Sequence, residues 1–191
     1  MSIVREIRPA ISMVVVFTIG LGFILPGLFT GAMQVVLPWQ ANGSLLSENG
    51  HEIGSVLIGQ NFTESKYFHP RPSALDTPYD AGTSGASNLA PTSAALMKTV
   101  AQRVAAYVKA YGPGPVPADA VTSSGSGLDP DISLANALRQ APAVATARHL
   151  PTSTVVGLVN KLAHHSYLGI VGTNNVNVLD LNLALDHLPA A

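Results

Sequence analysis

The strongest pattern in the chain is a long run of apolar positions close to its N-terminus. No charged residue occurs between Arg8 and Glu48, and residues 11–29 contain only two polar side chains. A helix needs about 20 apolar residues to cross the hydrocarbon core of a bilayer. The run therefore predicts a membrane-spanning anchor helix over residues 10–37, and Trp39 follows it where aromatic side chains anchor such helices at the interface.

A cleaved signal peptide is the alternative explanation of this run. The apolar region of a signal peptide has about 7–15 residues and ends at a cleavage site made of small residues. Residues 30–32, Thr-Gly-Ala, offer a weak site of this kind, but the apolar run is longer than that limit and continues past the site. The pattern favours an uncleaved anchor.

The charges that flank the span predict its orientation. Arg5 and Arg8 precede it, whereas the next positive residue is Lys66. Because the cytoplasmic flank of a membrane helix carries the excess of positive charge, residues 1–9 are expected in the cytoplasm and residues 38–191 outside it. Small residues let helices approach closely in lipid, so the glycines of the span are candidate sites for packing against another membrane helix. They are Gly20, Gly22, Gly27 and Gly31.

Residues 38–191 alternate short helical and strand patterns, which predicts a single small α+β domain outside the membrane. The clearest pattern is a helix over residues 91–111, where apolar residues recur every three or four positions before Gly112 and Pro113. Residues 61–88 match neither period and are expected to be irregular. The other expectations are a linker over 40–50, strands over 53–60, 120–123 and 176–181, and helices over 133–140, 142–149 and from 152 onward.

Composition narrows the chemistry that the chain can perform. Charged residues make up 11% of it, the net charge is −1 and there is no cysteine. These values exclude disulfides and Cys-based zinc sites, and they argue against a nucleic-acid partner, which needs a basic footprint. The chain also lacks the Walker phosphate loop, the Gly-x-Ser-x-Gly elbow and the His-Glu-x-x-His zinc motif.

Two local clusters have competing explanations. Residues 124–131, Ser-Gly-Ser-Gly-Leu-Asp-Pro-Asp, combine hydroxyls and carboxylates that suit a cation loop or a nucleophile. They also suit a turn followed by a helix cap at Asp131 or Ser133, which we favour. His164 and His165 are adjacent, so on a helix they point about 100° apart and do not share one metal. No metal site is expected.

The irregular segment carries candidates for contact with another protein. Residues 67–73 combine aromatic, imidazole and guanidinium side chains in a loop stiffened by proline, and Tyr and Arg are favoured at protein interfaces. Prolines also lower the entropy that a loop loses on binding. We expect no catalytic residue here. The candidate partner-binding residues are Tyr67, Phe68, His69, Arg71, Tyr79 and Asp80.

Several longer motifs make the chain resemble one bacterial family. They are PWQANGSL (38–45), GSVLIGQNF (54–62), YFHPRPSA (67–74), SGASNLA (84–90), VTSSGSGLDPDIS (121–133) and NVLDLNLALD (177–186). In this order they resemble the C subunit of the Kdp-type ATP-driven potassium transporter. Two departures from the family pattern, at Ala86 and at residues 172–175, touch no residue with an established catalytic role.

The resemblance implies a membrane complex in which a channel-like subunit binds potassium and a P-type ATPase subunit hydrolyses ATP. The C subunit would be a non-catalytic, single-pass protein of the bacterial inner membrane that stabilises or assembles the complex and raises its ATP affinity indirectly. ATP, magnesium and potassium would act in the complex, with no cofactor in this subunit. The chain itself has neither an Asp-Lys-Thr-Gly-Thr phosphorylation motif nor a Thr-Val-Gly-Tyr-Gly filter.

Two other functions are weighed against this one. A membrane-anchored extracytoplasmic serine hydrolase would use Ser124 or Ser126 with His69 and an aspartate, but that alternative rests on residue type alone. Direct binding of ATP conflicts with the expected topology, because cytoplasmic nucleotide does not reach an outer domain.

Overall fold

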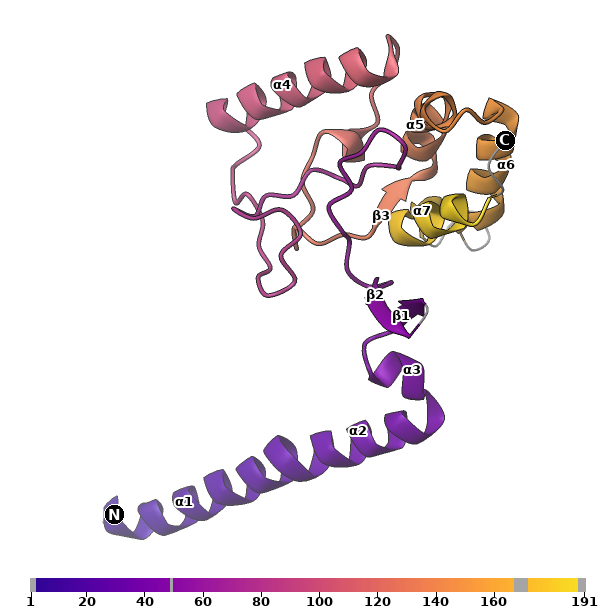
Figure 1. The fold of residues 1–191 in the computed structure, drawn as a ribbon. Coiled ribbons are helices and arrows are strands. Elements are labelled where there is room, and N and C mark those ends of the chain that lie inside the picture. The colour runs from indigo at the N-terminus through magenta and orange to yellow at the C-terminus, as the bar shows by residue number, and fades with distance from the viewer. Residues whose placement is uncertain (1–2, 49, 167–171, 189–191) are drawn as a thin grey trace. The chain divides into compact units, whose positions relative to one another are not determined.

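The structure is a computed structural model of the 191-residue chain that describes residues 3–48, 50–166 and 172–188 (Figure 1). The chain divides into two units, Met1–Ile53 and Gly54–Ala191. Each unit is described by itself.

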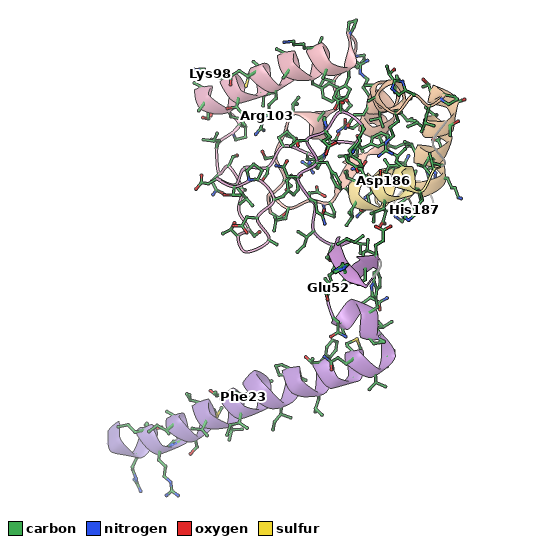
Figure 2. The ribbon with its side chains drawn as sticks, in the orientation of Figure 1. Phe23, Glu52, Lys98, Arg103, Asp186 and His187 are labelled. Carbon is green, nitrogen blue, oxygen red and sulfur yellow. The ribbon has the colours of Figure 1, made fainter. Side chains whose placement is uncertain are left out.

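The first unit begins with a long apolar helix that contains most of the predicted span. It consists of α1 (Ile3–Ile19), a π-helical turn η1 (Gly20–Ile24) and α2 (Leu25–Val36). Over Arg5–Val36 it is long and apolar enough to cross a membrane. Apolar side chains such as Phe23, which is 70% exposed, project from it on all sides (Figure 2), as expected of a helix that lipid surrounds.

The π turn has a local cause in Pro26. A proline has no N–H, so Pro26 cannot bond to the carbonyl of Gly22 four residues earlier, and its ring would press against that carbonyl. In the structure the helix widens just before the proline, and the N–H of Leu25 donates to the carbonyl oxygen of Gly20, five residues back. The disturbance expected at Pro26 therefore takes the form of one π turn, a common way for helices to absorb such a break.

A short helix and a hairpin follow the apolar helix. They are α3 (Pro38–Ala41), β1 (Leu45–Glu48) and β2 (His51–Ser55), and the two strands form a two-stranded sheet. The indole Nε1 of Trp39 donates to the carbonyl oxygen of Leu45 at 2.8 Å. The prediction of a plain linker over 40–50 is wrong, and the strand expected over 53–60 starts earlier and ends at Ser55, because it pairs within a hairpin.

The second unit contains four helices, a 3-10 turn and a second small sheet among its described residues. In chain order these are α4 (Ala94–Tyr111), η2 (Ala118–Ala120), β3 (Asp131–Ser133), α5 (Leu134–Ala147), α6 (Thr152–Leu162), β4 (Asn175–Asn177) and α7 (Val178–Asp186). Strands β3 and β4 are antiparallel, with Ile132 opposite Val176. The mixture of helices and small sheets confirms the α+β class.

The core of this unit lies between α5, α6, α7 and the β3–β4 sheet, which are grouped in Figure 1, while α4 extends away from them. Its buried members are Phe68, Ile132, Ala137, Ala141, Val144, Ala145, Val155, Val159, Val176, Val178, Leu181 and Leu185. Most are small or β-branched, so the helices approach closely. The exceptions are Leu181, Leu185 and Phe68, and Phe68 comes from the irregular segment and is 0% exposed.

Three sequence-based boundaries are wrong. Pro142 does not separate two helices: α5 runs through it, because the neighbouring Ala141 and Val144 are buried against the core while Pro142 itself faces solvent. Residues 120–123 form no strand, because Ala120 ends the η2 turn and residues 121–123 are irregular. The last strand ends at Asn177, whose side chain caps α7 by accepting hydrogen bonds from the N–H groups of Leu179 and Asp180, so most of the strand predicted over 176–181 is helix.

Candidate functional site

The irregular segment is fixed by two buried amide side chains that reach it from the core helices. Asn182 on α7 accepts a hydrogen bond from the N–H of Phe68 at 2.8 Å and donates to the carbonyl oxygen of Phe68 at 3.0 Å. Gln140 on α5 does the same for His69, at 2.8 and 3.1 Å. Each amide thus satisfies one backbone N–H and one backbone carbonyl group, which in a sheet would be paired with a neighbouring strand. Sequence reasoning missed both residues, although polar amides on the apolar faces of helices were the available indication.

The predicted partner-binding residues are mostly engaged within the unit. Phe68 belongs to the core, so the expectation that it is available at the surface is wrong. The Tyr67 hydroxyl donates to Asp186 at 2.9 Å, and burial raises the pKa of that phenol. Asp80 is exposed, and its carboxylate accepts the N–H of Gly82.

Arg71 and Tyr79 brace the segment from inside. The Arg71 guanidinium pairs with Asp129 at 2.6 Å, and the Tyr79 hydroxyl donates to the Arg71 carbonyl oxygen at 2.6 Å. Burial raises the pKa of Tyr79 well above its usual range. A side chain at Gly59 would come within 2.5 Å of the Tyr79 ring and 2.7 Å of the Asp129 carbonyl oxygen, so only glycine fits there. Contact of these residues with a partner stays a prediction, but their internal roles are clear.

The Ser-Gly loop forms the turn that the sequence favoured. The Ser124 hydroxyl accepts the N–H of Gly127 at 2.9 Å, and the Ser126 hydroxyl accepts the N–H of Leu128 at 3.1 Å. After the turn, Ser133 caps α5 by accepting the N–H of Asn136 at 3.1 Å. These are the local hydrogen bonds of a turn followed by a helix cap.

The same loop lacks the arrangement of a serine hydrolase. The His69 ring is hydrogen-bonded to the Tyr111 hydroxyl at 2.7 Å and to the Glu64 carbonyl oxygen at 3.2 Å. Within the described part of the chain, neither Ser124 nor Ser126 meets an imidazole. Those serines line an open cavity of about 560 Å³, and His69 lines a different one. The hydrolase alternative therefore lacks its base at the nucleophile.

His164 and His165 follow the end of α6 at exposed positions. The backbone of His164 pairs with that of Asn175, its N–H donating at 2.8 Å and its carbonyl oxygen accepting at 3.1 Å. Their backbone thus extends the small sheet.

A polar network lies beneath α4. The Tyr107 hydroxyl donates to Asn136 at 2.8 Å, and Gln140 donates to the same oxygen at 3.0 Å. Asn136 in turn donates to Asp119 at 2.9 Å. Burial raises the pKa of Tyr111 to about 12. This network joins α4, α5, η2 and the irregular segment, and it borders a cavity of about 260 Å³.

The glycines of the apolar helix are open to a neighbour. Apart from adjacent residues and the nearby backbone of the helix itself, a Cβ placed at Gly20, Gly27 or Gly31 would have no described atom within 4 Å, and one at Gly22 would meet only Thr18, at 4.0 Å. Gly27 and Gly31 are four residues apart and share one side of α2. Packing of these glycines against another helix stays a prediction.

Comparison with known proteins identifies the family. Residues 7–187 match the family model "K+-transporting ATPase, c chain". The potassium-transporting ATPase KdpC subunit of Gemmatimonas aurantiaca is 50% identical over 188 residues, which cover 97% of this chain and 94% of that protein. The KdpC subunit of Mycobacterium tuberculosis is 50% identical over 187 residues, 96% of this chain and 99% of that protein. The chain therefore belongs to the KdpC family of subunits of potassium-transporting ATPases.

Proposed function

We propose that the chain is a non-catalytic accessory subunit of an ATP-driven potassium-uptake complex, and that it stabilises or assembles a channel-like potassium-binding subunit and a P-type ATPase subunit. Family membership supports a place in the transporter. The observation that carries the accessory role is the engagement of the candidate catalytic groups: Ser124, Ser126 and His69 each hold backbone or side-chain partners of the fold and do not meet one another.

In this proposal ATP, magnesium and potassium act in the other subunits, and this subunit carries no cofactor. The N-terminus lies in the cytoplasm and the second unit lies outside the inner membrane. An effect of the chain on ATP affinity then passes through coupled conformations of its partners, because the nucleotide and the outer unit are on opposite sides of the membrane.

Co-expression of the three subunits tests the proposal. With the chain present, a tag on it should retain the channel-like and ATPase subunits through detergent extraction, and potassium-stimulated ATP hydrolysis should be recovered. Without the chain, the other two subunits should separate or lose that activity. An intact, fully active pair lacking the chain would contradict the accessory role.

The Ser124→Ala, Ser126→Ala double variant separates this function from a hydrolase. Cells that depend on the transporter at low potassium should grow as well with the double variant as with the wild type. Loss of growth with a complex that still assembles normally would restore a chemical role for the serines.

A further inference from the structure

Arg103 reaches from the middle of α4 into the cavity beneath it without meeting a carboxylate. Its Nη1 donates to the Val121 carbonyl oxygen and to the Ser123 hydroxyl, both at 3.1 Å. Its Nε and Nη2 make no hydrogen bond with the described residues, and no acidic side chain among them forms an ion pair with it. Figure 2 shows the side chain on the face of α4 that is turned toward the rest of the unit.

Two other arginines of the unit have carboxylate partners, whereas Arg139, like Arg103, forms no ion pair with a described residue and donates to the Gly112 carbonyl oxygen at 2.6 Å. Arg71 pairs with Asp129 and Arg148 with Asp186, each at 2.6 Å. A guanidinium presents a planar fork of donors that suits the two oxygens of a carboxylate. Burial lowers the pKa of Arg103, as expected where a charge is partly removed from water without a counter-ion.

The rest of the cavity wall has its polar groups satisfied. The hydroxyls of Tyr107 and Tyr111 are hydrogen-bonded to Asn136 and His69, and the two phenol rings pack with centroids 4.6 Å apart. The methyl groups of Ala106, Ala110 and Ala120 complete the lining. The Nε and Nη2 groups of Arg103 are therefore the hydrogen-bond donors left without a partner in the described wall of this cavity.

The size of the cavity limits its occupant. At about 260 Å³ it is smaller than the range of about 300–1,000 Å³ typical of pockets for drug-sized ligands. A carboxylate on a short apolar stem fits these dimensions and this lining. The surface around the cavity also suits a carboxylate on an apolar segment. Helix α4 has no acidic residue, and its exposed side includes several alanines and Met97, which is 64% exposed. Such a surface complements an apolar protein segment that carries an acidic side chain.

We propose that the cavity beneath α4 receives an aspartate or glutamate side chain from another subunit of the transporter, whose carboxylate pairs with Nε and Nη2 of Arg103. The proposal rests on the accessory function proposed above. The expected partner-binding set was Tyr67, Phe68, His69, Arg71, Tyr79 and Asp80. The proposal keeps His69, adds the adjoining Pro70, and moves the rest of the docking surface to α4, since His69 and Pro70 line the same cavity.

Retention of variants in the co-expressed complex is the first test. Arg103→Gln should reduce the fraction of the chain retained by the other subunits about tenfold or more, and Arg103→Glu should reduce it further through repulsion. Lys161→Gln and Lys161→Glu, at an exposed position of α6, make the same charge changes and should retain the chain like the wild type. Equal retention of all four variants, or equal loss in the Lys161 pair, would overturn the proposal.

A measurement on the wild type covers the case in which Arg103 variants fold poorly. Phenylglyoxal modification of Arg103, measured by peptide mass spectrometry relative to the unfolded chain, should be rapid in the isolated full-length chain and suppressed in the assembled complex. Unchanged reactivity on assembly would overturn the proposal. Suppression in the isolated chain by millimolar acetate or phosphate, as strong as in the complex, would overturn it in favour of a free-anion site.

The two proposals fail differently. If a tag on the wild-type chain retains no other subunit, the accessory function itself is wrong. If the wild-type chain is retained, but Arg103 variants behave like the wild type and Arg103 reacts equally in both states, the docking site alone is wrong.

Discussion

Buried amide side chains fix the irregular segment by hydrogen bonding to its backbone. Asn182 is 1% exposed, and both polar atoms of its amide bond to the backbone of Phe68. A sequence without periodicity can therefore be as well fixed as a strand, provided that side chains satisfy its backbone. The residue types were visible in the sequence, but the pairing of position 182 with position 68 was not, because it depends on the tertiary fold.

Replacing Asn182 by Ala should destabilise the chain strongly. The N–H and the carbonyl group of Phe68 would each lose a partner in a buried place, at a cost of about 1–3 kcal/mol per group. Urea unfolding of the full-length chain in detergent measures the change. Asn160→Ala, at an exposed position of α6, is the control and should stay within about 0.5 kcal/mol of the wild type. An Asn182 variant as stable as that control would show that the amide pairing contributes nothing.

The carboxyl of Asp131 should make stability depend on pH. It accepts hydrogen bonds from Asn175 at 2.6 Å and from Asn177 at 3.2 Å. Burial raises its pKa above the usual 3.8, the charge of Asp129 raises it further, and His164 and the bond from Asn177 oppose the shift. Asp180, another nearby carboxylate, acts in the raising direction. The folded chain thus holds this proton more tightly than the unfolded chain does.

It follows that ionised Asp131 lowers stability above its folded pKa, and that this cost disappears as the pH falls through that pKa toward 3.8. The free energy of unfolding of the wild type, taken relative to Asp131→Asn, should therefore rise between neutral pH and about pH 4. Denaturant titrations of both proteins at several pH values measure the difference, with Asp76→Asn as a control at an exposed site. A difference that is constant or falls on acidification would contradict the assignment.

At the scale of elements, periodic segments were predicted well. The helix expected over 91–111 is α4, and Ser93 caps it by accepting the N–H of Leu96. Thr152 starts α6 as expected. Such helices can be predicted from local sequence, because the spacing of their apolar residues and the residues that end them lie close together in the chain. Local rules failed where packing outweighed them, as at Pro142 inside α5.

The candidate docking site was predictable only in part. His69 was singled out from the sequence, but Arg103 was not, since an arginine in a helical pattern looks like a solvated position. Its significance comes from the absence of a carboxylate near it among the described residues, which depends on the positions of α4, η2 and the loop after it in space.

The apolar helix should be a docking element as well as an anchor. Gly27 and Gly31 present a small-residue face that no side chain among the described residues occupies. Gly22→Leu and Gly27→Leu should weaken retention of the chain in the detergent-extracted complex, because the added side chains hold a neighbouring helix away, while membrane insertion persists. Val35→Leu, at a position 83% exposed, is the control for added bulk. Wild-type retention of both glycine variants would show that the span serves only as a tether.

At the scale of the whole molecule, the distribution of positive charge along the chain predicts the membrane topology. Arg5 and Arg8 lie at the start of α1, before the uncharged stretch of the helix, and the chain carries no other positive residue until Lys66. This asymmetry favours a cytoplasmic N-terminus and an outer second unit. In the proposed topology the second unit would be separated from cytoplasmic ATP and would lie on the side from which potassium is taken up.

Cysteine accessibility tests this topology cleanly, because the native chain contains no cysteine. Asn160→Cys places a thiol at an exposed position of α6, and it is a better reporter than Ser126→Cys, since the Ser126 hydroxyl is needed by the turn. In intact cells whose outer envelope admits small molecules, an impermeant maleimide should label Asn160→Cys and spare Glu6→Cys. Opening the inner membrane should make the Glu6 variant reactive. The reverse pattern would place the second unit in the cytoplasm, and with it any effect of this subunit on ATP would become direct.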